Sequence, residues 1–165
     1  WFLVLGSWFL VLGSEVSFLA HTSPRPLCRE APAHNMSKRS YRDLVAWQQA
    51  MDLVDDVYAC VRGFPGEELF GLTMQMRRAA TSIPNNIAEG HGRFSFRDFR
   101  QFLRKARGSA LELETEIMIA KRQGYIGNET ESLLLKKAER VTRLINGLIR
   151  NLTQRLTNRE RRTRN

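Results

Sequence analysis

Five arginines recur at alternating four- and three-residue spacing and are the residues best placed to bind a charged partner. They are Arg93, Arg97, Arg100, Arg104 and Arg107. On an α-helix of 3.6 residues per turn, this spacing aligns side chains along one face. A guanidinium presents several N–H donors in one plane, which suits it to pairs of phosphate oxygens. We expect this face to contact the phosphates of RNA or DNA, and the alternative is a solvated face that only keeps the protein soluble.

The charge of the whole chain favours the same kind of partner. The formal net charge is +9 and the isoelectric point is near 10.4. Such a charge is evidence about association with polyanions and none about the fold. We find no aromatic interleaving of the arginines for base stacking and no known nucleic-acid motif. Any binding is therefore expected to be largely independent of base sequence.

Residues that could carry catalysis form no recognisable arrangement. The sequence has no Gly-rich phosphate loop, no Glu-x-x-His pair and no nucleophile with a histidine placed beside it. Glu112, Glu114 and Glu116 step by two, so they fan around a helix and are predicted to be solvated. His91 follows Glu89 as a possible acid–base pair, but glycines flank it and predict an exposed loop. We expect a non-enzymatic protein with no metal and no cofactor.

Two further sets of residues are candidates for contacts between helices or between subunits. A polar row lies beside an apolar row between positions 71 and 92, so it is either a plain polar flank or a contact surface. A pair seven residues apart, further along the chain, lies away from its helix's apolar row and is expected to be buried against a second subunit. The polar row is Gln75, Arg78, Ser82, Asn86 and Glu89, and the pair is Leu111 and Met118.

Apolar residues at helical spacing predict four helices to position these groups, over about 40–62, 71–92, 95–123 and from 128 onward. Short loops between them predict an all-α fold, an antiparallel up-down-up-down four-helix bundle with its second helix bent at Pro84. In the first helix the predicted buried face holds Leu44, Trp47, Met51, Val54, Tyr58 and Val61, and Ala50, Leu53 and Val57 widen it. In the third, Ala106, Gly108 and Ala110 are expected to keep the helix slim, so that a neighbouring helix can approach closely.

The chain divides into three parts by composition. Residues 1–35 repeat W-F-L-V-L-G-S and precede Met36, so we interpret them as an unstructured upstream or non-native segment. Gly6 and Glu15 interrupt their apolar run, which argues against a membrane span, and no basic region precedes it as in a signal peptide. Residues 36–155 are the predicted bundle, and 156–165 a basic flexible tail. Two cysteines in unlike contexts imply no disulfide framework, so we expect a cytoplasmic protein.

Several short motifs together resemble one protein family. They are Leu44-x-x-Trp47, Phe64-Pro65, Gln75-x-Arg77-Arg78-Ala79, Ser82-Ile83-Pro84-x-Asn86-Ile87-Ala88-Glu89-Gly90 and Phe102-Leu103. Their combination resembles the 23S rRNA intervening-sequence proteins (S23-type), which implies a homopentamer of four-helix bundles. A related group of bundles assists reverse transcriptases of retroelements. Two functions therefore stay open: a homo-oligomer that binds RNA or DNA, and a protein-interaction scaffold or reverse-transcriptase accessory factor without direct nucleic-acid binding.

Overall fold

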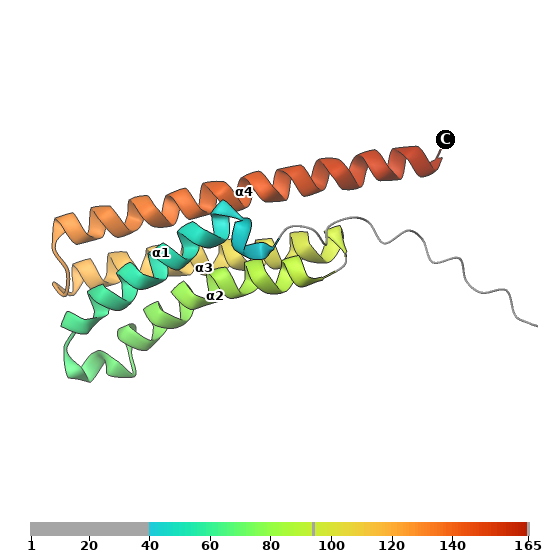
Figure 1. The fold of residues 1–165 in the computed structure, drawn as a ribbon. Coiled ribbons are helices and arrows are strands. Elements are labelled where there is room, and N and C mark those ends of the chain that lie inside the picture. Colours follow the sequence, from blue (N-terminus) through green and yellow to red (C-terminus); the bar gives the residue numbers. More distant parts are fainter. Residues whose placement is uncertain (1–39, 94, 165) are drawn as a thin grey trace, which may run out of the picture. The chain divides into compact units, whose positions relative to one another are not determined.

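A computed structural model describes residues 40–93 and 95–164, and this part of the chain is all-helical (Figure 1). The four long helices are α1 Val45–Cys60, α2 Leu72–Gly92, α3 Phe96–Arg122 and α4 Asn128–Arg164. Three short 3₁₀ turns, η1 Tyr41–Asp43, η2 Val61–Gly63 and η3 Gly66–Leu69, precede α1 and connect it to α2. The predicted all-α class is confirmed. The interpretation of residues 1–35 lies outside the described residues.

Helices α2 and α3 pack side by side in opposite directions. Near the end of α2, Gly90 lies against Phe102. Nearer its start, Arg78 is 3.8 Å from the Glu112 carboxylate. Residue numbers therefore fall along α2 as they rise along α3, which is the antiparallel arrangement that the short turn between them requires.

The remaining contacts close the bundle. Thr142 donates to the Glu114 carboxylate at 3.5 Å and joins α4 to α3, while the Lys137 ammonium pairs with Asp56 and joins α4 to α1. Each long helix thus packs against two others: α1 contacts α2 and α4, and α3 also contacts α2 and α4. Figure 1 shows the four helices alongside one another.

Local sequence signals set the ends of α3. The Ser95 hydroxyl accepts from the backbone N–H of Asp98 at 3.4 Å, so it satisfies one donor of the first turn. Beyond the other end, Gly124 takes a φ of +77°, which a side chain would disfavour. Both features agree with the predicted limits of this helix.

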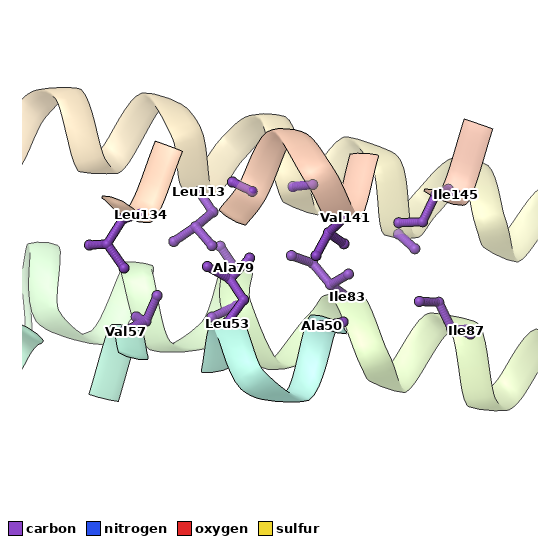
Figure 2. Close-up of a cluster of buried hydrophobic side chains, with 14 of the residues drawn as sticks. Ala50, Leu53, Val57, Ala79, Ile83, Ile87, Leu113, Leu134, Val141 and Ile145 are labelled. Atoms are coloured by element: carbon purple, nitrogen blue, oxygen red, sulfur yellow. The ribbon is translucent and has the colours of Figure 1, made fainter. Parts of the chain in front are cut away.

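The core is a single cluster of aliphatic side chains in which every helix takes part (Figure 2). Most of the predicted buried positions of α2, α3 and α4 are buried. The fully enclosed larger residues include Ile83 and Ile87 of α2, Leu113 of α3 and Ile145 of α4. At about 1.5–3 kcal/mol for each large side chain removed from water, this cluster supplies the main stabilising term of the bundle.

The buried face of α1 is shifted toward the residues that were expected to widen it. Ala50, Leu53 and Val57 are buried, whereas Met51 is 36% and Tyr58 38% exposed. The two sets of apolar residues both recur at helical spacing, so the spacing alone does not show which set is enclosed in the core. The face that packs has alanines near its start, while Tyr58 lies at the surface with the Arg77 guanidinium 5.2 Å from its ring centroid.

Of the small residues expected to allow close packing, Ala106 and Ala110 are fully buried, while the close contact between α2 and α3 is at Gly90 rather than Gly108. A Cβ added to Gly90 would lie 2.5 Å from Phe102 Cβ and 2.9 Å from Phe99 Cδ2, whereas one added to Gly108 meets nothing within 4 Å. Helix α2 stays helical on both sides of the buried Pro84. The predicted bend there stays a prediction.

The boundary placed at residue 156 is not a helix end. Helix α4 continues through the predicted tail to Arg164. The physical reason is that residues 156–164 hold no glycine or proline, and a helix already formed adds further residues at little cost. The flexibility expected of this segment stays a prediction.

Candidate nucleic-acid interface

The bundle separates its charges along its length. We divide the described bundle at the contact between Ser82 and Ser109, whose hydroxyl oxygens are 2.9 Å apart near the middle of α2 and α3. The half comprising 41–54, 82–110 and 146–164 contains thirteen lysines and arginines against five acidic residues. The half comprising 55–81 and 111–145 contains nine against ten. The first is called the basic half below, because the excess positive charge of the bundle lies there.

Four of the five predicted arginines form one row on α3 within the basic half. Arg97, Arg104 and Arg107 are exposed, and Arg100 is half-buried with a buried Nε that has no hydrogen-bond partner. We call these four the α3 arginines. Their exposed members form no ion pair with any side chain in residues 40–93 and 95–164, so their guanidinium donors face solvent and can meet an anionic partner.

Arg93 does not belong to that row, contrary to the prediction. It caps the end of α2 in extended backbone, because the chain turns there before α3 begins. Its guanidinium donates to the Glu89 carboxylate at 2.6 Å and lies 5.3 Å from the ring centroid of Phe102. It contributes charge to the basic half, but Glu89 already engages it.

Aromatic rings do lie beside the cations, which corrects the expectation that none interleave with them. Phe102 has the Lys105 ammonium 4.5 Å from its centroid as well as Arg93. Phe96 has the Arg155 guanidinium at 5.9 Å. These rings are half-buried and hold cationic side chains of the same chain in position.

The predicted polar row lies along the seam between α2 and α3. Ser82 bonds to Ser109, and Asn86 Nδ2 donates back to the Ser82 carbonyl at 2.8 Å. Arg78 reaches Glu112 of α3. Gln75 and Glu89 are exposed, and Glu89 pairs within its own turn. Ser82 and Arg78 therefore make contacts between helices, whereas Gln75, Asn86 and Glu89 form no hydrogen bond or ion pair with the described residues of α3.

Leu111 and Met118 are 47% and 44% exposed on α3, away from the core as the sequence predicts. Further apolar side chains are exposed in the same half of the bundle, at its η3–α2 end. They are Leu69, Phe70 and Met74, of which Phe70 is 80% exposed. The half that lacks excess positive charge therefore presents apolar surface.

The burial of one ionisable residue was missed by sequence reasoning. Glu116 is only 6% exposed, and its Oε2 has no hydrogen-bond partner. Burial, and next the neighbouring Glu112 carboxylate, raise its pKa to about 7, while Arg78 acts in the opposite direction. The prediction of a solvated face was wrong for this residue. Position 116 directly precedes the buried Ile117 and follows Leu113 by three, which was the available signal.

The proposed acid–base pair is not formed. His91 is half-buried with its ring 5.7 Å from that of Phe99, and Glu89 is bound to Arg93 instead. Within residues 40–93 and 95–164, no three His, Cys, Asp or Glu side chains group as a metal would require. No described helix is long and apolar enough to cross a membrane.

Comparison with known proteins places the chain. The family described as 23S rRNA-intervening sequence protein matches residues 42–147. The chain belongs to this family. The structure is also similar to a crystal structure of a protein with unknown function from the S23 ribosomal protein family of Bacteroides thetaiotaomicron, with 23% identity and a TM-score of 0.58. That match covers 64% of this chain and 98% of the other, and it shows a shared fold. Among curated proteins, no match was found.

Proposed function

We propose that this family member is a non-enzymatic cytoplasmic protein that binds RNA or DNA through its basic half. The observation that carries the proposal is the separation of charge, thirteen cations against five acidic residues in one half and near balance in the other. The exposed α3 arginines are spaced along about 15 Å of helix, a length over which they can follow a run of phosphates. The intervening-sequence family name agrees with a nucleic-acid connection.

The proposal includes assembly into a homo-oligomer. It is supported by the exposed apolar residues Leu111 and Met118, together with Phe70 and its neighbours in the other half. Apolar surface of this kind is typical of contacts with another protein. The resemblance to the family supplies the number, a pentamer.

Salt dependence of binding tests the nucleic-acid proposal. The affinity for an rRNA fragment, measured by fluorescence anisotropy between about 50 and 200 mM salt, is expected to fall steeply, because several phosphate contacts release counterions. The variant Arg97→Glu with Arg104→Glu is expected to lose binding. Its matched control is Arg122→Glu with Arg140→Glu, which changes the net charge equally at exposed positions of the other half.

Two results would contradict the proposal. One is absence of retention of the RNA or DNA at low salt by the unmodified protein. The other is equal loss of affinity in both variants, because only overall charge would then matter.

The alternative function is a protein-interaction scaffold or an accessory subunit, for instance of a reverse transcriptase, without direct nucleic-acid binding. It is favoured by the exposed Leu69, Phe70 and Met74, which a protein partner would cover. Under this function the α3 arginines serve solubility. Unchanged retention of a protein partner by the Arg97→Glu, Arg104→Glu variant, without any nucleic-acid binding, would support it.

A further inference from the structure

The inner face of α4 changes from apolar to cationic where the helix extends beyond the bundle. Along the body of the helix, Ile145, Leu148 and Leu152 recur at three- and four-residue steps and face the core. The same steps continue with three arginines. They are Arg155, Arg159 and Arg162. The face that meets apolar neighbours within the bundle is therefore cationic beyond it.

Arg155 marks the level at which α4 passes the end of the bundle. Its guanidinium lies 5.9 Å from the ring centroid of Phe96, the first residue of α3. The nine residues from 156 to 164 follow in helical conformation. At 1.5 Å per residue they extend about 13 Å past that level. We call this segment the C-terminal arm, and Figure 1 shows it at the free end of α4.

Beyond Leu156 at its start, which is half-buried, the arm has little that a protein partner could bury. Residues 157–164 read T-N-R-E-R-R-T-R and include no apolar side chain. Stable protein interfaces are built around a desolvated apolar or aromatic centre, which this segment lacks. Residues 157–163 are exposed, and of their charged side chains only Glu160 is acidic. A polyanion matches this surface better than a second protein chain does.

The arm also lies outside the part of the chain that defines the family. The family match ends at residue 147, nine residues before the arm begins. The family match therefore assigns no role to the arm.

We propose that the C-terminal arm binds the phosphate backbone of the same nucleic acid that the α3 arginines contact. This inference rests on the proposed function and extends its binding surface beyond the bundle. The α3 arginines cover about 15 Å from Arg107 to Arg97, and the arm adds about 13 Å. The combined length corresponds to roughly eight steps of a duplex at about 3.4 Å each.

The repulsion among the arm's own charges points to the same occupant. Arg155, Arg159 and Arg162 are neighbours at i,i+4 and i,i+3 on one helix face, where like charges destabilise the helix. Phosphates lying between them would remove this repulsion. Binding is therefore expected to increase the helical order of the arm.

The test compares two double variants that each remove two positive charges. Arg159→Gln with Arg162→Gln changes the inner face of the arm, while Arg161→Gln with Arg140→Gln changes its outer face and a distant exposed site. Glutamine keeps the helical preference of arginine. On an RNA or DNA duplex of about 24 base pairs, the first variant is expected to bind at least about tenfold more weakly at low salt. Its slope of log affinity against log salt is expected to fall by about 1.8. The second variant should lower the affinity and the slope by clearly less.

The possible outcomes separate this inference from the function beneath it. If the unmodified protein binds neither RNA nor DNA, the proposed function and this inference both fail. If it binds, and the Arg159, Arg162 variant matches its control, the arm makes no phosphate contact and this inference alone fails. If that variant keeps its affinity but changes the oligomer mass in light scattering, the arm serves a second copy instead, which also overturns the inference.

Discussion

At the scale of single residues, Glu116 is the group whose environment is least favourable to its charge. The side chain is buried, with one carboxylate oxygen unpartnered and the Glu112 carboxylate nearby. Its pKa is about 7 in the folded protein and about 4.5 when unfolded. Since the folded state holds a proton that the unfolded state releases, the contribution of this group to stability falls as pH rises from 4.5 to 7.

Replacing Glu116 by Gln should therefore stabilise the protein at pH 8 and have little effect at pH 4.5. The expected gain in the free energy of unfolding at pH 8 is on the order of 1–3 kcal/mol, because a neutral amide avoids the desolvation cost of a buried carboxylate charge. Urea unfolding at several pH values measures it. Glu67→Gln, at an exposed position, is the control and should show no such change. A gain of equal size at both pH values would contradict the role of ionisation.

Gly90 offers a second prediction at this scale. Gly90→Ala places a Cβ where Phe102 and Phe99 already lie, at 2.5 and 2.9 Å, so α2 and α3 must move apart. We expect a loss of about 1–3 kcal/mol in the free energy of unfolding. Gly108→Ala is the matched control in an open helical position, where alanine should stabilise by about 0.5–1 kcal/mol. Denaturant unfolding compares them, and equal effects would show that the contact at Gly90 is not tight.

At the scale of elements, the helices depend on burying their apolar faces together. Ile145 of α4 is fully buried in the shared core. An aspartate there would leave an unpaired charge among aliphatic side chains, so Ile145→Asp should abolish the cooperative thermal transition seen by circular dichroism. Leu133→Asp, on the exposed side of the same helix, is the control. A retained transition within a few degrees of the unmodified protein would contradict this account of the core.

Helix number and helix type were predictable from the sequence because long apolar periods repeat four times and turn residues separate them. The centre of the buried face in α1 was not predictable, since Met51 and Tyr58 have the same period as Ala50 and Leu53. The end of α4 was missed because loss of apolar residues was taken as loss of helix. The position of the α3 arginines followed from spacing alone. Arg93 did not, because its pairing with Glu89 depends on the turn between helices.

At the scale of the whole molecule, the exposed apolar residues of the other half predict self-association. Leu111→Glu with Met118→Glu should reduce the mass seen by light scattering at micromolar concentration, since charges would enter a buried contact. Val45→Glu, at an exposed apolar position in the basic half, is the control. A monomer mass for the unmodified protein would remove the role given to Leu111 and Met118.

The lengthwise separation of charge has a consequence for any ring built from this chain. In a cyclic oligomer all copies are related by rotation about one axis, so their like halves lie at the same height and radius. The basic halves of all copies would then form one continuous band, while the other halves, with their exposed apolar residues, form a second band. A long nucleic acid could touch several copies at once, and contacts that are weak singly would add through their high local concentration. Affinity would then depend on the length of the nucleic acid more than on its sequence.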